Sequence, residues 1–423
     1  MTQFSSNCRG QRLYVVQAAL EHLVSLLVSG SFLATLTREL GFSDSLTGIL
    51  SAVISLGCLF QLLSVFLRRR VKTVVVVFSA VNQILFLLLY VIPLGGGGKP
   101  LKTTAFVVLI LLAYLIYNWI HPKKFNWLMS TVDNARRGTF TAGKEIVSLV
   151  AGIAFSFGMG TLVDRLSAAG NIKTAFALCA VVLAVLMVGH TLSLVFVPEK
   201  DDTSSPRSLK KSMHLLVHNT ALRRTIVVSA LYNIAAFSAR PFFGSYEIKE
   251  LGMSLGLISL LSMAGSVSRI AVSHLWGRYA DRRSFAAMIE KCLLVLDLAW
   301  LCVMLATPAN GMWMFLGYYV LNGIAMGGIN SAQANLIYDC VPRSECADAL
   351  AISYAITGVA GFATTLGVSP LVDRIQQNGN TLFGLPIYAQ QVMVALALAV
   401  TVIAVIYTRV ALIRSKAVKG VEK

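Results

Sequence analysis

Charged residues are scarce in this chain of 423 residues: they make up 13% of it, whereas hydrophobic residues make up 56%. Soluble domains contain about 25% charged and about 45–50% apolar residues. One or two water-soluble cores cannot bury so much apolar surface, and the composition therefore predicts a polytopic membrane protein. The same composition excludes a disordered chain and a collagen-like chain.

Motifs of enzymes and metal sites are also lacking. The seven cysteines form no C-x-x-C pair and several lie inside apolar runs, which favours inert, packed thiols over disulfides or zinc ligands. The chain has no nucleotide-binding G-x-x-x-x-G-K-[ST] loop, no H-E-x-x-H pair and no nucleophile elbow. We therefore expect neither an enzyme nor an ATP-driven pump, and no cofactor or metal.

Long apolar runs are what the sequence has instead. A helix needs about 20 apolar residues to cross the hydrocarbon core of a membrane. Twelve segments meet this length: residues 13–36, 45–67, 73–94, 102–121, 139–162, 173–197, 223–246, 255–276, 285–307, 312–337, 348–371 and 387–412. They lack the alternation of a membrane β-barrel, and backbone groups in lipid must bond within their own segment. The sequence therefore predicts an all-α membrane protein with twelve transmembrane helices.

One long polar stretch separates the sixth run from the seventh. It begins at Pro198 and contains the segment DDTSSPRS at 201–208, a composition that is typical of a linker. We predict an N-terminal six-helix bundle over residues 1–197, a cytoplasmic linker over 198–222 and a C-terminal six-helix bundle over 223–423.

Most of the 36 Lys and Arg residues fall in loops on one predicted side of the membrane. Examples are the basic segment 68–72 after the second run, and Lys123 and Lys124 after the fourth. Cytoplasmic loops carry such an excess of basic residues, so we expect both termini to be cytoplasmic and the protein to lie in the cell membrane. Topology thus explains the net charge of +17, and no nucleic-acid partner is expected.

The two halves of the chain share an internal repeat. RELGFS at 38–43 recurs as KELGMS at 249–254, and LVDR at 162–165 recurs at 371–374. The two offsets are nearly equal and are each about half the chain, which favours a duplication. Because each copy has an even number of helices, both copies enter the membrane from the same side, and the repeat is parallel.

With these features the chain resembles the major facilitator superfamily over essentially its whole length. A cytoplasmic loop motif of that family, G-x-x-x-D-R followed by basic residues, is matched by Gly277, Asp281, Arg282 and Arg283. The resemblance implies that these residues form a gating latch that holds the cytoplasmic side in the outward-open state. The loop after the second run departs from the motif, because it has the basic residues but neither the Gly nor the Asp.

The resemblance also implies that the first, fourth, seventh and tenth helices line a central cavity, and each of these four runs carries a polar stripe. The residues that we expect to bind the solute are Gln17, Tyr114, Asn118, Asn233, Phe237, Arg240, Asn322, Met326 and Asn330. Such stripes can instead hold helices together. Their coincidence on all four predicted lining helices favours a cavity.

Two ionisable residues stand out in these stripes. A charged side chain costs at least about 2.5–3.5 kcal/mol at the centre of a membrane helix, so it is retained for a partner, for water or for a function. We expect Glu21 to bind the coupling proton. Arg240 does not deprotonate, and we expect it to contact an anionic group of the solute or to pair with a carboxylate. The alternative for both residues is a fixed structural ion pair.

The sequence therefore favours a secondary active transporter that moves a small polar or amphipathic solute by alternating access, coupled to a proton gradient in preference to a sodium gradient. A non-transporting membrane receptor or scaffold on the same fold, and an uncoupled facilitator, are the alternatives. The expected partners are the solute, the coupling cation and the lipid bilayer, and the chain is expected to be a monomer.

Overall fold

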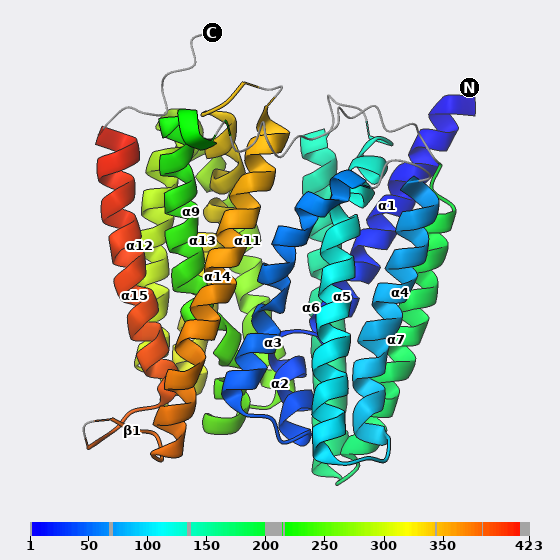
Figure 1. Cartoon of the computed structure of the whole chain (residues 1–423), viewed down its shortest axis with the longest axis vertical. Helices are drawn as coiled ribbons and strands as arrows, with labels where there is room; N and C mark the ends of the chain where they lie inside the picture. Colours follow the sequence, from blue (N-terminus) through cyan, green and yellow to red (C-terminus); the bar gives the residue numbers. More distant parts are fainter. Residues whose placement is uncertain are drawn as a thin grey trace. The chain divides into compact units, whose positions relative to one another are not determined.

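The computed structural model of the chain describes residues 2–66, 71–132, 137–198, 214, 216–342, 345–382 and 384–414. Within these residues the chain is helical almost throughout (Figure 1). One short antiparallel hairpin pairs β1 (Thr381–Leu382) with β2 (Leu385–Pro386). The predicted linker over 198–222 and the basic loop at 68–72 lie largely outside the described residues.

The six runs predicted in the first half of the chain each correspond to one helix or to consecutive helical segments. These are α1 (Thr2–Leu27) with α2 (Gly30–Glu39), α3 (Asp44–Gly57) with η1 (Cys58–Phe66), α4 (Val71–Val91) with η2 (Ile92–Leu94), α5 (Lys99–Met129), α6 (Arg137–Ala168) and α7 (Ile172–Val195). The break between α1 and α2 falls at Gly30, whose φ of 55° favours a residue without a side chain.

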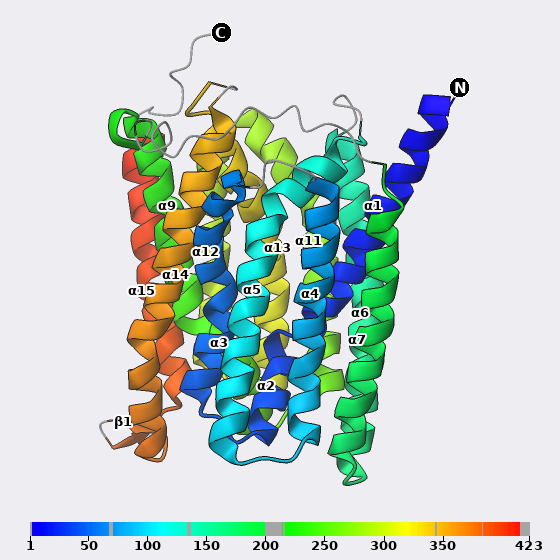
Figure 2. The same ribbon diagram turned by 45° about the vertical axis from the view of Figure 1, so that its right-hand side comes forward.

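The six runs of the second half are also helical (Figure 2). They are α9 (Thr220–Ala239) with η4 (Arg240–Phe242), α10 (Phe243–Ser245) and the π-helical turn η5 (Tyr246–Glu250); α11 (Leu255–Arg282); α12 (Phe285–Met304); α13 (Gly311–Tyr338); α14 (Cys346–Gln377); and α15 (Ala389–Tyr407) with the π-helical segment η6 (Thr408–Arg414).

Eleven helices among the described residues are long and apolar enough to cross a membrane. The helix at the remaining predicted crossing is α12, which has three charged residues: Glu290, Lys291 and Asp297. Its other residues are mostly apolar, and its core-facing side chains are fully buried, as Trp300 illustrates. The prediction of an all-α membrane fold is confirmed, and α12 occupies the ninth of the twelve predicted positions.

The chain packs into two compact units, and each of them is discontinuous in sequence. Unit 1 contains Met1–Phe42, Leu63–Ser205 and Ser254–Leu260, and unit 2 contains Ser43–Leu62, Pro206–Met253 and Leu261–Lys423. The predicted boundaries of the two bundles, at 197 and 223, stay a prediction.

In unit 1, α4 packs against α5 and α7, and α1 packs against α6 and α7. The segment 254–260 joins this unit through the carboxylate of Asp164 near the end of α6. The two oxygens of that carboxylate accept the backbone N–H groups of Leu255 at 2.9 Å and Gly256 at 2.7 Å. An anion at the N-terminus of a helix is favourable because the first N–H groups are unpaired and the helix dipole is positive there.

In unit 2, α12 packs against α13 and α15, while α9 packs against α14 and α15. The helix α3 also belongs to this unit and lies along α14, where Ser55 Oγ donates to the carbonyl of Gly358 at 3.0 Å. At the other end of α3, Asp44 forms an ion pair with Lys249 and accepts a hydrogen bond from Gln376 at 2.7 Å. Polar contacts thus fix both ends of α3 within unit 2.

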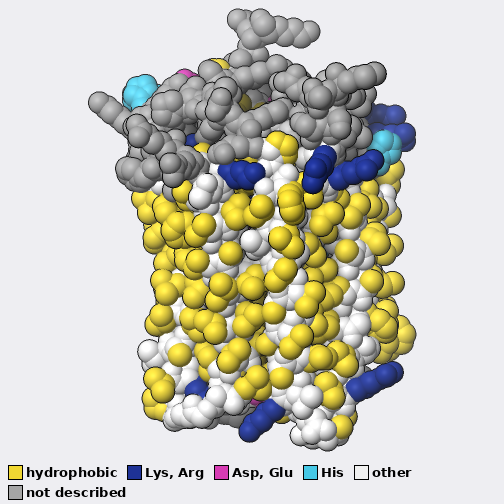
Figure 3. All heavy atoms as spheres, turned by 90° about the vertical axis from the view of Figure 1, so that its right-hand side faces the viewer, with side chains coloured by type: hydrophobic (Ala, Val, Ile, Leu, Met, Phe, Trp, Pro, Cys, Tyr) yellow, Lys and Arg dark blue, Asp and Glu magenta, His cyan; other side chains and the backbone are white. Residues whose placement is uncertain are grey.

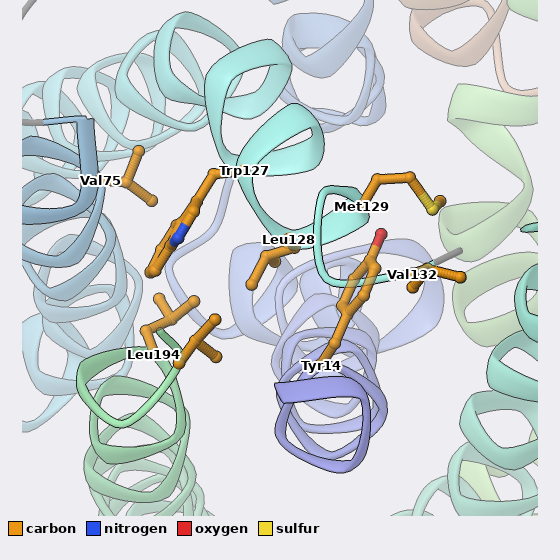
Figure 4. Packing of buried hydrophobic residues seen from close by; sticks show 8 residues of the cluster. Tyr14, Val75, Trp127, Leu128, Met129, Val132 and Leu194 are labelled. Carbon is orange, nitrogen blue, oxygen red and sulfur yellow. The ribbon is translucent and has the colours of Figure 1, made fainter. Parts of the chain in front are cut away.

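A hydrophobic cluster in unit 1 holds the last turn of α5 (Figure 4). Trp127, Leu128 and Met129 of this turn are buried against neighbours that include Tyr14 of α1 and Val75 of α4. The indole N–H of Trp127 donates to the carbonyl of Pro198 at 3.0 Å. This packing stabilises α5 beyond Pro122.

The prediction that the fourth crossing ends at residue 121 is therefore wrong. Pro122 removes one backbone donor from the helix, but burial of the apolar side chains after it keeps the helix going to Met129. As a consequence, Lys123 and Lys124 lie in α5 and not in a cytoplasmic loop, and Lys124 is buried.

The outer side of α7 is apolar and exposed. Val181, Val185, Val188 and Leu192 are all exposed and recur at the spacing of one helix face. Figure 3 shows a molecular face that is hydrophobic across its middle, with Lys and Arg side chains near its upper and lower edges. Such a surface is typical of helices embedded in lipid, with basic residues at the interfaces.

Candidate functional site

A buried ion pair lies inside unit 1, between α1 and α5. The Lys124 ammonium is 2.8 Å from Oε1 of Glu21, and the two side chains are 6% and 25% exposed. The partner of Glu21 is thus a lysine that the sequence analysis assigned to a loop. The available signal was its spacing, because Lys124 follows His121 by three residues and continues the polar stripe of the fourth run.

Gln17 and His190 complete the hydrogen bonding of this ion pair. The side-chain amide of Gln17 donates to Glu21 Oε2 at 2.6 Å and lies 2.9 Å from His190 Nε2. Lys124 Nζ lies 3.4 Å from the same Nε2 atom. Because an ammonium group only donates, Nε2 is the acceptor and the ring hydrogen belongs on Nδ1. Nδ1 is buried and has no hydrogen-bond partner among the described residues.

His190 is a site residue that the sequence analysis missed. It lies on α7, in a run that is otherwise almost entirely apolar, and it is 1% exposed. A single histidine in such a run carries no periodic signal, and only its contact with Lys124 distinguishes it from a histidine of the packed core.

A cavity of about 10 Å³ adjoins the ion pair, which is room for about one water molecule. Its wall includes Glu21, Ser79, Asn82, His121, Lys124 and His190. Polar groups from four helices thus converge on a space that is too small for a metabolite. A space of this size suits a single water molecule.

Two other residues of the predicted solute site pack within unit 1. The Tyr114 hydroxyl lies 3.4 Å from the carbonyl of Val28, and the ring of Tyr114 meets that of Phe86 edge-on. The side-chain amide of Asn118 donates to the carbonyl of Tyr114 at 2.9 Å. Both side chains are buried, so their role in solute binding, like that of Gln17, stays a prediction.

In unit 2, Arg240 lies where α9 passes into the short turn η4. Its Nη2 atom donates to Asn322 Oδ1 at 2.8 Å and lies 3.7 Å from the Met326 sulfur. Its Nη1 atom donates to the Tyr232 hydroxyl at 3.1 Å. The guanidinium carbon lies 5.5 Å from the ring centre of Trp300. The structure thus brings three predicted residues together. It adds Tyr232, Trp300 and Tyr318, whose hydroxyl also accepts a hydrogen bond from Arg240, and the sequence did not point to these three.

Every side chain that contacts Arg240 in the described part of the chain is neutral. Aromatic rings attract a guanidinium through their π faces, but they do not neutralise its charge. The Nε–H group of Arg240 is buried and has no hydrogen-bond partner among the described residues. A cation in this state is costly inside a membrane protein, and the site favours an additional anion.

A second, larger cavity of about 210 Å³ lies in unit 2. Among the residues that form its wall are Ser55, Cys58, Tyr232, Asn233, Phe237 and Gln333, and no described residue of the wall is charged. Two residues of the predicted solute site, Asn233 and Phe237, are therefore in this wall, and Tyr232 connects the cavity to Arg240. Asn330 is exposed on α13, and its role in solute binding stays a prediction.

The residues of the predicted latch lie at the end of α11. This helix continues to Arg282, so Gly277, Asp281 and Arg282 are helical and the prediction that they form a loop is wrong. Gly277 is within the helix and does not mark its exit. Asp281, Arg282 and Arg283 are exposed, and their role as a latch stays a prediction.

One protein family accounts for the helices and sites described above. The family model described as the Major Facilitator Superfamily matches residues 18–365 and 225–421 of the chain. The chain belongs to the major facilitator superfamily. As a member of this superfamily it is a multi-pass membrane transporter of small-molecule solutes and not an enzyme, as the sequence predicts.

Solved structures confirm the major facilitator fold. A variant of the nucleoside transporter NupG matches with a TM-score of 0.75 at 13% identity, over 95% of this chain and 100% of that chain. The POT-family transporter PepTSo matches with a TM-score of 0.70 at 11% identity, over 96% and 99% of the two chains. A bacterial homologue of the human lysosomal transporter Spinster matches with a TM-score of 0.66 at 11% identity, over 97% and 96%. No curated protein sequence matches this superfamily member.

Proposed function

We propose that this superfamily member is a secondary active transporter that moves a small polar or amphipathic solute by alternating access and is driven by a proton gradient. The proton-binding residue in this proposal is Glu21. One observation carries it: the carboxylate of Glu21 is paired with a buried ammonium group and faces a cavity with room for about one water molecule. A carboxylate in this position can receive a proton inside the membrane.

Protonation of Glu21 would neutralise the carboxylate and leave the Lys124 ammonium without a counter-charge. An uncompensated buried charge is strongly destabilising, so the protonated state favours another arrangement of the helices that hold the pair. Proton binding and the conformational equilibrium are then linked, because the proton binds the two arrangements with different affinities. In the arrangement that the structure describes, His190 Nε2, 3.4 Å from Lys124 Nζ, is an acceptor that stays available to the ammonium group when Glu21 is neutral.

The test measures proton movement driven by solute. A metabolite library is first screened for compounds that raise the unfolding temperature of the purified protein, since a ligand of the folded state stabilises it by mass action. The stabilising compounds are then added to proteoliposomes that contain the pH dye pyranine. We expect at least one compound to move protons with the solute, and an imposed pH gradient to accumulate that solute.

The decisive variant is Glu21→Gln, which keeps the size of the side chain and removes its charge and its proton. We expect it to bind solute and exchange it across the membrane, but not to accumulate it with a pH gradient. Glu39→Gln, at an exposed acid of α2 in the same unit, is the matched control and should transport normally. Full gradient-driven accumulation in Glu21→Gln contradicts the proposal. Solute flux without proton movement indicates a facilitator, and no flux indicates a receptor or scaffold.

We also propose that the protein lies in the cell membrane as a monomer with both termini in the cytoplasm. The excess of Lys and Arg in the loops of one predicted side supports this orientation. Fusion of the C-terminus to a fluorescent protein and to alkaline phosphatase tests it. A cytoplasmic C-terminus gives fluorescence and no phosphatase activity, whereas the reverse pattern contradicts the proposed orientation.

A further inference from the structure

We propose that the solute is a small organic carboxylate, which binds in the 210 Å³ cavity of unit 2 with its negative charge at the Tyr232 hydroxyl and with Arg240 as the counter-charge behind it. Gln333 supplies a second donor from the wall of the same cavity. This inference rests on the proposed transport function and names the solute class that the proposed function leaves open.

Arg240 carries a charge that its neighbours do not neutralise. It donates to the hydroxyls of Tyr232 and Tyr318 and to the amide oxygen of Asn322, and it contacts a thioether and two aromatic faces, all of them neutral. A guanidinium has five N–H groups, and one of them, Nε–H, is buried without a partner among the described residues. The positive charge is therefore unmatched in unit 2 as the structure describes it, and an anion placed nearby would compensate it.

Tyr232 connects this charge to the cavity. Tyr232 lines the cavity, and its oxygen accepts a hydrogen bond from Arg240 at 3.1 Å. The Tyr232 hydroxyl itself donates to the Met326 sulfur, with 3.1 Å between oxygen and sulfur. A thioether is a weak acceptor, so little is lost when the hydroxyl turns to a carboxylate oxygen. Hydrogen bonds to an ionised acceptor are about twice as strong as those between neutral groups.

Gln333 is an unused donor in the same wall. The side-chain nitrogen of Gln333 is buried and has no hydrogen-bond partner among the described residues. Gln333 lines the same cavity as Tyr232. A buried donor without an acceptor is costly, and an acceptor on a bound solute would satisfy it. This observation is independent of Arg240 and points to the same ligand chemistry.

The wall of the cavity is uncharged and partly apolar. No described residue of its wall is acidic, so nothing in the wall repels an anion. Phe237 and Ile337 give it an apolar side for the body of the solute. Its volume of about 210 Å³ is smaller than the 300–1,000 Å³ of pockets for drug-sized ligands. The cavity therefore suits a small carboxylate with an apolar body better than a large or highly charged solute.

The experiment compares carboxylates with carboxamides of nearly the same shape. The probes are acetate and acetamide, lactate and lactamide, benzoate and benzamide, and nicotinate and nicotinamide. Binding to the full-length protein in detergent is measured by thermal stabilisation and by protection of Cys58 from N-ethylmaleimide, because Cys58 lines the cavity. We expect at least one carboxylate to stabilise the protein and slow the labelling of Cys58, and to bind at least about tenfold tighter than its carboxamide.

Three variants show which residues carry this preference. Arg240→Gln should weaken carboxylate binding by about tenfold or more and leave the affinity for the carboxamide unchanged, because only the charge pairing is lost. Tyr232→Phe should weaken it several-fold while Arg240 remains. Arg223→Gln removes an exposed arginine of the same helix and should bind like the wild type. If Arg240→Gln does not fold, Tyr232→Phe, which removes a single oxygen, still tests the inference.

Three outcomes would overturn the inference: an acid and its amide bind equally, only neutral compounds such as uridine bind, or no carboxylate binds. These measurements need no ion gradient, so they are independent of proton coupling. If carboxylates bind but a pH gradient drives no uptake, the inference stands and the proposed coupling fails. If a neutral solute is accumulated with protons, the coupling stands and the inference fails.

Discussion

Lys124 and Arg240 are both cations buried among membrane helices, and they are held in opposite ways. Lys124 lies 2.8 Å from a carboxylate, and that carboxylate is also bonded to Gln17. Arg240 is surrounded by two phenols, an amide, a thioether and an indole. The site in unit 1 balances its own charge, whereas the site in unit 2 does not. The site in unit 1 needs no further charge, whereas the site in unit 2 favours an anionic ligand.

The internal repeat makes this difference sharper. Glu21 precedes the motif RELGFS by the same number of residues as Tyr232 precedes KELGMS. The position that contacts the buried cation is therefore a carboxylate in one copy of the repeat and a phenol in the other. Substitutions in the two sites test whether the two cations differ in this way.

The largest effect is expected for Glu21→Leu. Removing one partner of a buried ion pair costs about 3–5 kcal/mol of folding free energy. Because a quarter of the Glu21 side chain is exposed, we expect about 3 kcal/mol, at the lower end of that range. The measurement is SDS-induced unfolding in mixed micelles, followed by tryptophan fluorescence.

The double variant Glu21→Leu with Lys124→Leu is its control. Replacing both charges by apolar groups leaves no unpaired charge, and stability should return to within about 1 kcal/mol of the wild type. If the double variant is as unstable as Glu21→Leu, packing rather than charge holds this site together.

A smaller effect is expected for Arg240→Met. The substitution removes an unmatched charge and leaves only neutral acceptors without their donor, so we expect a change of about 1 kcal/mol or less by the same measurement. A loss as large as that of Glu21→Leu would mean that Arg240 has a compensating charge in the folded protein, and the contrast between the two cations would disappear.

The smallest effect is expected for Gln333→Leu, and Gln17→Leu is its counterpart in unit 1. Gln17→Leu removes a hydrogen bond to an ionised carboxylate. It should lower the free energy of unfolding by no more than the about 1.5–3 kcal/mol that is typical of such bonds, because Glu21 is partly exposed to water. Gln333→Leu removes a donor that has no partner among the described residues, and it should be neutral or stabilising. An equal loss of stability in both variants would contradict the assignment of Gln333 as an unused donor in the protein without solute.

Much of the fold could be predicted from the sequence, because each crossing of the membrane needs a long apolar segment. All twelve predicted runs correspond to helices. Hydropathy alone identifies α12 less clearly than the other crossings, because Glu290, Lys291 and Asp297 lie within its twenty residues. The polar stripes led to Glu21 and Arg240, and Arg240, Asn322 and Met326 meet in the structure.

The partners of the two charged residues could not be predicted so readily. Pro122 and the two lysines after it have the composition of a helix end, and only packing around Trp127 keeps α5 intact and buries Lys124. His190 and Tyr232 are single polar residues in apolar surroundings, and their importance depends on contacts across helices. The sequence also predicted that the helix ends near Gly277, whereas α11 continues to Arg282.

The packing of α3 on α14 also constrains how the protein is made. Ser55 and Gly358, which share a hydrogen bond, are 303 positions apart in the chain. At a synthesis rate of 5–20 residues per second, the ribosome delivers Gly358 roughly 15–60 seconds after Ser55. During that time α3 resides in the bilayer without its final neighbour, so we expect a nascent chain that stops before α14 to be cleaved by membrane proteases more readily than the finished protein.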